Sequence, residues 1–235
     1  HDFRKSSEEH HSWNVAGTSR LLEHAADFNV RKVVFLSSAN VYGPRPDNPQ
    51  FLTEDAPLMA SLDFPAIRDL IEADMQATSF FWRSGGRSIE TVILRPVHIL
   101  GSVQNAPSKY LRLKRIPQIM GYDPMVQVIH EQDMADAITM ALKPGIRGVF
   151  NISGPGEFPL SVLVRETGKP TLPMPLPLFK KYLRSLWRYR LTSFPVPMLV
   201  HILYTCMVDG NRARRVLGFR PKFSLKDTIK DVLAA

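Results

Sequence analysis

Short apolar runs that alternate with longer amphipathic segments most constrain the fold of this chain. Four runs have the length and β-branched content of buried strands, at residues 32–37, 89–94, 125–129 and 148–153. Apolar residues at helical spacing occupy three intervals, at residues 8–28, 65–82 and 135–142. Strands that are joined by helices run parallel in one sheet. The order therefore predicts an α/β fold with a parallel sheet and helices on both of its faces.

Residues 8–28 are expected to form one helix with a single buried face. The apolar side chains at the spacing of that face are Trp13, Leu21, Leu22, Ala25 and Phe28. A later helix should begin just before Ala135, and Asp133 stands where its N-cap is needed.

Proline density marks a change of organisation after the last predicted strand. Four prolines predict an extended linker, because proline neither continues a helix nor donates to a sheet: Pro170, Pro173, Pro175 and Pro177. We therefore expect two units, a sheet domain at residues 1–153 and a smaller cap lobe at residues 154–235. The basic, irregular segment 101–123 is expected to belong to the cap lobe.

The excess of basic residues lies in the C-terminal third of the chain. There are 30 lysines and arginines against 22 aspartates and glutamates, which gives a net charge of +8. Residues 179–220 hold nine of the basic side chains and one acidic residue, Asp209, and so account for the whole excess. An anionic partner should meet this region, and a nucleic acid, a phosphate-bearing ligand and a lipid surface all remain open.

Residues 179–190 predict an amphipathic helix within that basic region. Its cations Arg184 and Arg188 are candidate contacts for a phosphate-bearing substrate, and the alternative is a cap helix that packs its aromatic side on the core. The apolar, proline-broken stretch 194–204 adds an anionic membrane surface as a less favoured partner. No helix-turn-helix spacing or RNA-binding signature accompanies the charge, so no specific nucleic-acid partner is expected.

Simple counts exclude several classes of protein. No run of 18 apolar residues occurs, so no ordinary membrane-spanning helix is expected. Cys206 is the single cysteine, and no histidines and cysteines have zinc-site spacing, so neither an internal disulfide nor a metal site is predicted. A reducing, cytoplasmic location is expected. The sequence begins at His1 without a secretory signal, and we expect a missing N-terminal segment.

Five segments, in family order, resemble the extended short-chain dehydrogenase/reductases, the NAD-dependent epimerase/dehydratase family that acts mostly on nucleotide sugars. The segments are Asn14-Val-Ala-Gly17-Thr18, Ser37-Ser38-Ala-Asn-Val-Tyr42-Gly43, Leu94-Arg95-Pro96 with Gly101, His130-Glu-Gln-Asp133-Met-Ala135, and Leu217-Gly218-Phe219-Arg-Pro221. The resemblance covers nearly the whole chain. It implies the second half of a Rossmann-like fold, NAD or NADP as cofactor, a small-molecule substrate with phosphate groups, and a homodimer.

The family's glycine-rich turn, which lies under the cofactor pyrophosphate, is not found in this sequence. None of the 13 glycines falls in a Gly-x-x-Gly-x-x-Gly or Gly-x-Gly-x-x-Gly run after a strand. Gly154-Pro155-Gly156 is expected to be an ordinary turn. We therefore expect the family's turn to precede His1 and the full-length protein to bind NAD(P).

The family's reaction centre contains a serine or threonine, a tyrosine, and a lysine four residues after the tyrosine. Ser38 matches the first position, whereas Phe64 stands at the tyrosine position and Arg68 at the lysine position. Phenylalanine has no proton to transfer, while arginine still donates to ribose hydroxyls. The motif is therefore degenerate. Tyr110 and Lys114 have the literal spacing but follow the strand that the family's pair precedes, and we interpret them as a surface helix or loop.

The resemblance assigns weaker roles to further positions. Asn14 matches a family asparagine near the cofactor, with a structural hydrogen bond as an equal alternative. Val97 falls where a backbone group meets the nicotinamide, and His98 falls where a side chain meets the substrate diphosphate. Asp133 matches a position with a capping role.

Two functions remain open at this stage. The first is a divergent NAD(P)-dependent sugar-nucleotide-type epimerase, dehydratase or reductase, in which another group supplies the proton that Phe64 cannot. The candidates for that group are Ser38, a water molecule, Tyr42 and His98. The second is a non-catalytic NAD(P)-binding subunit or scaffold with the same fold, which the substitutions at Phe64 and Arg68 favour.

Overall fold

The computed structural model describes residues 7–60, 65–84, 89–189 and 196–235. It begins with α1 (Ser7–His11), the π-helical segment η1 (Ser12–Ala16) and α2 (Gly17–Asp27). The residues at the two junctions, His11 and Ala16, have right-handed helical dihedral angles, so the three pieces form one continuous rod. The helix predicted over residues 8–28 is confirmed.

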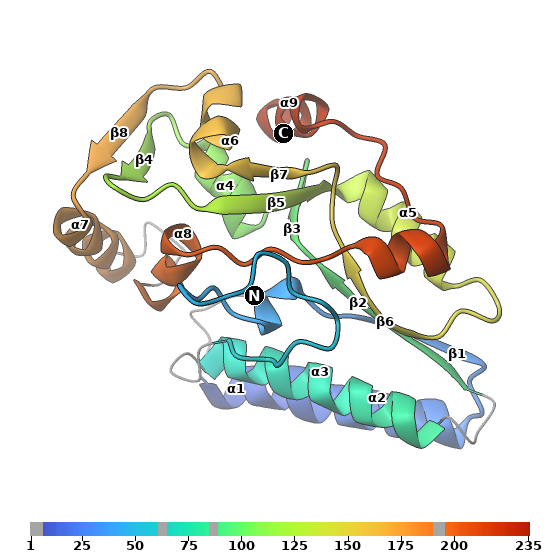
Figure 1. Cartoon of the computed structure of the whole chain (residues 1–235). Coiled ribbons are helices and arrows are strands. Elements are labelled where there is room, and N and C mark those ends of the chain that lie inside the picture. The colour runs from blue at the N-terminus through green and yellow to red at the C-terminus, as the bar shows by residue number, and fades with distance from the viewer. Residues whose placement is uncertain (1–6, 61–64, 85–88, 190–195) are drawn as a thin grey trace.

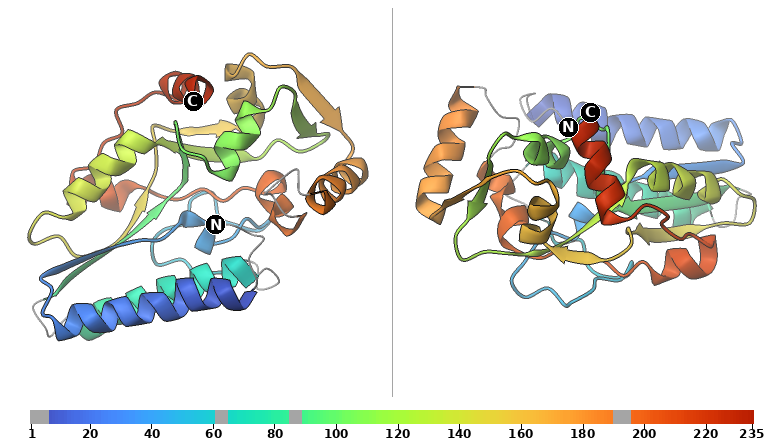
Figure 2. Two further views of the ribbon diagram at one scale, coloured as in Figure 1. Left: turned by 180° about the vertical axis from the view of Figure 1, so that it is seen from behind. Right: turned by 90° about the horizontal axis from the view of Figure 1, so that it is seen from above.

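Three parallel strands form the main sheet in the order β1–β2–β6. They are β1 (Lys32–Leu36), β2 (Glu90–Pro96) and β6 (Gly148–Ile152). The crossover helix α3 (Pro65–Ser84) lies beside α2 on one side of this sheet, and α5 (Glu131–Ala141) lies on the other (Figure 1; Figure 2). The predicted α/β, Rossmann-like architecture with helices on both faces is confirmed.

A second group of elements continues from the main sheet. Its strands are β3 (His98–Leu100), β5 (Met125–His130) and β7 (Glu157–Pro159). The pairing of β3 with β5 is parallel, whereas β5 and β7 are antiparallel. Its helices are α4 (Ala106–Arg112), α6 (Leu160–Glu166) and α9 (Leu225–Ala234). Leu100, Val164 and Ile229 lie buried at the centre of this group.

A third group joins two segments that are far apart in the sequence. β4 (Ile116–Ile119) pairs in parallel with β8 (Thr171–Met174), and α7 (Leu176–Arg188) follows β8. The group ends with η3 (Val196–Leu199) and α8 (Val200–Leu203). Part of the predicted linker is therefore a strand. It tolerates Pro173 because a strand at the edge of a sheet does not use every backbone N–H in the ladder.

The C-terminal region also contributes to the core of the main sheet. Two short elements, η2 (Ala39–Val41) and η4 (Ala213–Leu217), lie against that core. Val208, Ala213 and Phe219 are buried in the same apolar cluster as residues of β2 and β6. The division of the chain at residue 153 stays a prediction.

A buried polar network fixes α3 to the main sheet. Arg95 on β2 donates to both carboxylate oxygens of Asp74 on α3, over 3.0 Å from Nε and 2.6 Å from Nη2. The same guanidinium donates to the Tyr42 hydroxyl over 2.9 Å, and this hydroxyl donates to Asn151 Oδ1 on β6 over 2.8 Å. The side chains of Arg95 and Asp74 are 4% and 0% exposed, so this salt bridge is buried.

The first helix buries a narrower face than the sequence predicts. Leu22 is in the core and packs with Phe80 of α3. In contrast, Trp13, Leu21 and Phe28 are all exposed by more than two thirds of their surface. The prediction that these three side chains are buried is wrong, because the buried face of the helix is the narrow stripe around Leu22 that packs on α3 and β1.

Asp133 is not the N-cap of α5. The N-cap is His130, whose Nδ1 accepts from Gln132 N over 3.0 Å. Asp133 lies in the first turn, is fully buried, and accepts from the backbone N–H groups of Lys222 and Phe223. Its role is to hold the segment that leads into α9, and the capping prediction is corrected.

Candidate functional site

Ser38 follows the carboxyl end of β1, where the chain turns into η2. Its backbone is extended, and its Oγ accepts a hydrogen bond from Asn40 N over 3.1 Å. This bond uses a lone pair and leaves the hydroxyl proton for another acceptor. Ser38 is half-buried, whereas the adjacent Ser37 is buried and donates to Asp74. Within the described residues no acceptor takes this proton, so a hydroxyl donor lies at the carboxyl edge of the sheet, where open α/β sheets bind ligands.

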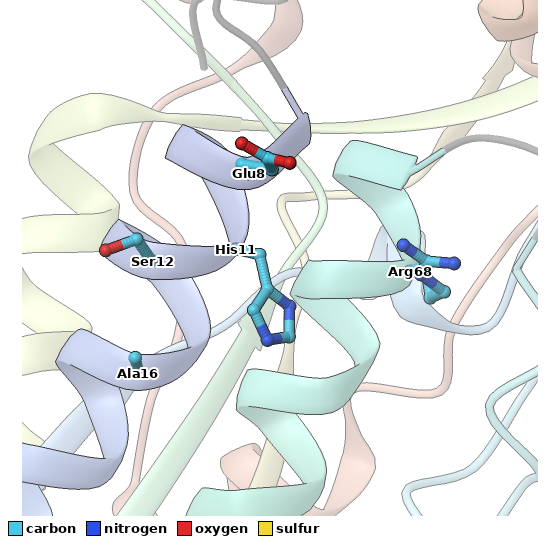
Figure 3. A pocket seen from close by; sticks show the side chains of 5 residues that line it. All are labelled: Glu8, His11, Ser12, Ala16 and Arg68. Carbon is cyan, nitrogen blue, oxygen red and sulfur yellow. The ribbon is translucent and has the colours of Figure 1, made fainter.

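Arg68 lies in the first turn of α3 and is exposed. It lines a pocket of about 510 Å³ whose other lining residues come from α1 and η1 (Figure 3): Glu8, His11, Ser12 and Ala16. A guanidinium stays protonated, so Arg68 offers a permanent positive charge and several N–H donors at this pocket. Phe64, at the tyrosine position, lies outside the described residues.

Helix α3 is the element around which the remaining candidates are arranged. It packs against η1, which carries Asn14, and against η2, which follows Ser38. Asn14 is half-buried, and its backbone oxygen accepts from Thr18 Oγ1 over 2.5 Å. Val97 is buried just after β2, and its N–H donates to Ile152 O over 3.0 Å. The Val97 N–H is therefore already bonded within the sheet, and a ligand at this position must bind to a different group.

Two of the proposed substitute acids are unsuited to that role. Tyr42 is 1% exposed, and burial raises the pKa of its phenol, an effect that the Arg95 guanidinium partly offsets. Its hydroxyl is engaged by Arg95 and Asn151, so Tyr42 is a core residue and not a proton donor at the cleft. Burial lowers the pKa of His98, so its imidazole is neutral near pH 7 and is not a charged acid.

Tyr110 and Lys114 do not form a reaction centre. Tyr110 lies in α4, and its hydroxyl donates to Pro117 O over 2.8 Å. Burial raises the pKa of this phenol. Lys114 is exposed beyond the end of the helix. The pair lies in a helix and in the loop after it, as interpreted from the sequence, but the Tyr110 side chain is half-buried and not at the surface.

Helix α7 presents Arg184 and Arg188 at exposed positions. On its other side Phe179 and Leu183 are buried with apolar residues of β4, β8 and η3. This is the packing expected of a cap helix whose cations lie in solvent. Among the described residues, α7 contributes nothing to the lining of the pocket beside Arg68. No helix in the described part of the chain has the length and apolar character needed to cross a membrane.

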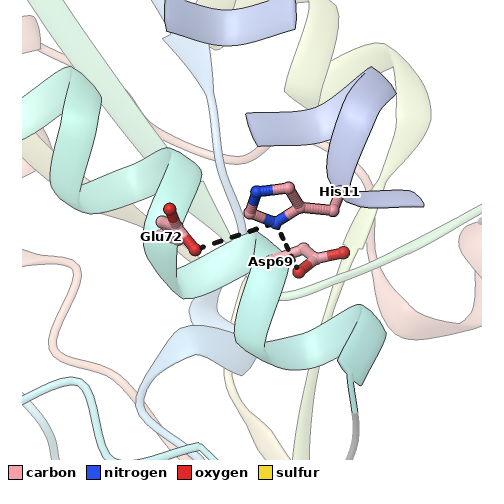
Figure 4. Close-up of side chains that lie close together, drawn as sticks. All are labelled: His11, Asp69 and Glu72. Atoms are coloured by element: carbon pink, nitrogen blue, oxygen red, sulfur yellow. Dashed lines mark ion pairs between the residues drawn. The ribbon is translucent and has the colours of Figure 1, made fainter. Parts of the chain in front are cut away.

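The sequence analysis missed a cluster of ionisable side chains beside this pocket. His11 Nδ1 lies 3.5 Å from Asp69 Oδ1 and 4.0 Å from Glu72 Oε2 (Figure 4). Asp69 and Glu72 are on α3, and His11 is on α1, more than 50 residues earlier in the chain. Spacing rules do not detect such a set. The available local signal was the pair Asp69 and Glu72, three residues apart on a helix and therefore on one face.

Comparison with known families shows to which family the chain belongs. The model of the NAD dependent epimerase/dehydratase family matches residues 2–153. The chain belongs to this family. The matched residues contain β1, β2 and β6 together with the helices α3 and α5. The resemblance drawn from the five sequence segments is confirmed at the level of the family.

Curated relatives of this epimerase/dehydratase family member are longer than the chain. An uncharacterized protein of Mycobacterium tuberculosis (strain ATCC 25618 / H37Rv) is 31% identical over 225 residues, which cover 93% of this chain and 58% of the relative. An uncharacterized protein of Sinorhizobium fredii (strain NBRC 101917 / NGR234) is 25% identical over 228 residues, which cover 91% of this chain and 55% of the relative. The chain thus spans little more than half the length of these relatives.

Solved structures of an epimerase and a dehydratase share the fold of this family member. UDP-glucose-4-epimerase from Stenotrophomonas maltophila, with bound NAD and formylated UDP-arabinopyranose, superposes with a TM-score of 0.73 at 20% identity, covering 98% of this chain and 72% of that one. dTDP-glucose 4,6-dehydratase from Bacillus anthracis, in complex with NAD, superposes with a TM-score of 0.72 at 19% identity, covering 95% of this chain and 67% of that one. Similarity at this level shows a common fold.

Proposed function

We propose that the chain is part of an NAD(P)-dependent enzyme of the sugar-nucleotide epimerase, dehydratase or reductase type, with a degenerate tyrosine–lysine motif. The observation that carries the proposal is the exposed guanidinium of Arg68 at the family's lysine position, on a pocket beside α3. The fold relatives that hold NAD and nucleotide sugars support it. A cytoplasmic location belongs to the same proposal, and the free thiol of Cys206 supports it.

The described residues fit the nicotinamide-ribose half of the cofactor. Arg68 supplies donors for ribose hydroxyls, and Ser38 supplies a hydroxyl at the carboxyl end of β1. Asn14, half-buried on η1, and the chain at Val97, whose N–H already donates to Ile152, would complete that contact. The pyrophosphate needs a glycine-rich turn after a strand, which this sequence does not contain. We assign that half of the cofactor to residues outside these 235.

The chemistry assigned to this chain is binding and proton donation. A nicotinamide cofactor, when bound, accepts or returns a hydride. Ser38 would donate its proton to a substrate oxygen, and Arg68 would hold the ribose. Phe64 has no proton to move, and the Tyr42 hydroxyl is engaged in the core. Proton transfer would then pass through Ser38 and a water molecule, so we expect slow turnover.

Calorimetric titration of the full-length protein with NAD and with NADP tests the proposal. One of the two should bind, and Arg68→Ala should weaken binding by about tenfold or more, because a hydrogen bond to a charged group contributes about 1.5–3 kcal/mol. Arg83→Ala is the matched control, since Arg83 is an exposed arginine in the last turn of the same helix. Failure of both nucleotides to bind, or equal losses in the two variants, contradicts the proposal.

The alternative is a non-catalytic cofactor-binding subunit with the same fold. The burial of Tyr42 and the neutral imidazole of His98 favour it, since they remove two candidate acids. The double variant Phe64→Tyr, Arg68→Lys separates the two functions. A gain of turnover with nucleotide sugars supports an enzyme whose remaining site is intact. Cofactor binding without turnover, in both the parent and the double variant, supports the subunit.

We also propose that the substrate carries phosphate groups and that Arg184 and Arg188 contact them. Both arginines are exposed on α7, and the nucleotide-sugar ligands of the fold relatives supply the chemistry. A nucleoside diphosphate should raise the melting temperature of the protein, and the pair of changes Arg184→Ala and Arg188→Ala should abolish that rise. Flotation with acidic liposomes at low salt, lost near physiological ionic strength, would instead support the membrane surface as the partner.

A homodimer is the last part of the proposal. Leu21 on α2, Phe28 just after it, and Met75 and Trp82 on α3 are all more than half exposed. The two helices lie side by side on one side of the sheet (Figure 2). Large exposed apolar patches mark interaction sites. A two-fold axis would set this surface against the same surface of a second copy.

A further inference from the structure

Asp69 is a buried carboxylate without a hydrogen bond. Its side chain is 0% exposed, and neither oxygen has a hydrogen-bond partner among the described residues. Burying a carboxylate is unfavourable unless cations or donors compensate it. Asp74, which is equally buried on the same helix, has that compensation, because Arg95 and Ser37 donate to its oxygens. Asp69 needs a positive partner of its own.

Two further side chains point at the same place. His11 Nδ1 lies 3.5 Å from Asp69 Oδ1 and 4.0 Å from Glu72 Oε2, and the ligand atoms of all three residues lie within 4.8 Å of one another (Figure 4). A tetrahedral ion with bonds of about 2.0–2.2 Å holds its ligands about 3.4 Å apart. The distance of 3.5 Å between His11 and Asp69 is near this value, and the distance of 4.0 Å between His11 and Glu72 is longer. Glu72 is 46% exposed and has room to close the remaining gap.

A direct hydrogen bond does not account for this arrangement. The distances of 3.5 and 4.0 Å from His11 Nδ1 exceed those of protein hydrogen bonds. One ring nitrogen also carries at most one N–H, so it cannot satisfy two carboxylates. An ion placed between the three side chains contacts all of them.

We propose that His11, Asp69 and Glu72 bind one divalent transition-metal ion, with Zn²⁺ as the reference ion. One imidazole nitrogen and two carboxylate oxygens form a donor set that Zn²⁺ accepts in three-ligand sites. His11 also lines the pocket beside Arg68, so a fourth position is open to water or to a ligand in that pocket. The ion links α1 to α3. This inference is independent of the cofactor proposal.

Calorimetric titration of the metal-depleted full chain with Zn²⁺ tests the site. One equivalent should bind. The variants His11→Ala, Asp69→Asn and Glu72→Gln should each weaken binding by more than about tenfold, the lower end of the loss caused by removing even an outer partner of a metal ligand. His10→Ala, the neighbouring histidine, and Glu23→Gln, an exposed acid on α2, are the controls and should leave the affinity unchanged.

Melting of the metal-free proteins separates an ion site from a simple ion pair. Asp69→Asn should not lower the melting temperature without metal, because it removes an uncompensated buried charge, yet it should abolish the rise that Zn²⁺ causes in the parent chain. The proposal is overturned if Zn²⁺ does not bind, or if His10→Ala weakens binding as much as His11→Ala. It is also overturned if Asp69→Asn and His11→Ala both destabilise the metal-free chain while Zn²⁺ has no effect.

Discussion

Asp74 and Arg95 place opposite charges inside the core where α3 crosses β2. Replacing Asp74 by Asn should lower the free energy of unfolding by about 3–5 kcal/mol, because the Arg95 guanidinium stays buried without its counter-charge. Urea denaturation followed by circular dichroism measures this loss. The control is Arg45→Gln, which breaks an exposed pair with Asp47 and should change stability little. Equal losses in the two variants would contradict the role given to the buried pair.

The adjacent residues Ser37 and Ser38 should respond differently to replacement by alanine. Ser38→Ala removes one acceptor at the start of η2 and should lower the free energy of unfolding by no more than about 1 kcal/mol. Ser37→Ala removes a donor to the buried Asp74 carboxylate and should lower it by about 1.5–3 kcal/mol. Thermal unfolding compares the variants. The reverse order would show that Ser38 is the structural group of the two.

His98 should make stability depend on pH in one direction. Burial lowers its pKa in the folded chain below the ordinary value of 6.5. The unfolded chain therefore binds more protons just below pH 6.5, and the free energy of unfolding falls as the pH drops through this interval. In His98→Gln this part of the fall should be absent, which melting curves recorded between about pH 5 and 7 measure. If the variant and the parent chain have the same pH profile of stability, His98 does not cause the fall.

At the scale of elements, the segment that leads into α9 depends on α5. Asp133 accepts from two backbone N–H groups of that segment, at Lys222 and Phe223. Asp133→Ala should lower the free energy of unfolding by about 1–3 kcal/mol, because partly buried donors lose their acceptor. Hydrogen exchange should show the loosened amides at residues 222–235.

Asp136 provides the control for this prediction on the same helix. Its carboxylate accepts from the Lys222 side chain over 2.6 Å and, among the described residues, makes no hydrogen bond with the backbone of the segment. Asp136→Ala should therefore leave exchange at residues 222–235 close to that of the parent chain. Equal protection in the Asp133→Ala and Asp136→Ala proteins would show that the segment is held by its apolar contacts alone.

Elements with strong periodicity were predictable from the sequence. The strands β1, β2, β5 and β6 begin and end within about two residues of the predicted runs, because continuous runs rich in β-branched residues are typical of strands in α/β sheets. The predicted burial of β1 is wrong, since this strand is half-buried and Leu36 at its end is exposed. The edge strand β8 was not predictable, since its prolines are typical of a linker and its partner β4 lies more than 50 residues earlier. Local patterns report propensity and carry no information on such pairing.

The residues of the candidate site also divide into those that local sequence patterns identify and those that only the fold brings together. Ser38 and Arg68 could be named as candidates because motif positions are local, and the structure puts them at a strand end and on a pocket. The cluster of His11, Asp69 and Glu72 was not found, because its members meet only when α1 packs on α3. The exposure of the apolar side chains on α2 could likewise not be predicted, since apolar periodicity does not identify the element that packs against a helix face.

At the scale of the whole molecule, the exposed apolar side chains of α2 and α3 predict a dimer. The parent chain should sediment as a dimer, and the double variant Leu21→Glu, Met75→Glu should sediment as a monomer with an unchanged circular dichroism spectrum, because charges would face each other across the two-fold axis. Leu178→Glu is the control, since Leu178 is an exposed leucine on α7. A monomeric parent chain would contradict the proposed dimer.

The parallel order β1–β2–β6 also sets when the sheet can form during synthesis. Lys32 of β1 faces Glu90 of β2, and Val92 of β2 faces Gly148 of β6. Within the described residues, close to 60 further residues must therefore be translated after β1, and again after β2, before the strand that pairs with it has been synthesised. At about 5–20 residues per second, each wait lasts roughly 3–12 s. During the first of them the edge of β1 that will pair with β2 is unpaired and is open to pairing with other nascent chains.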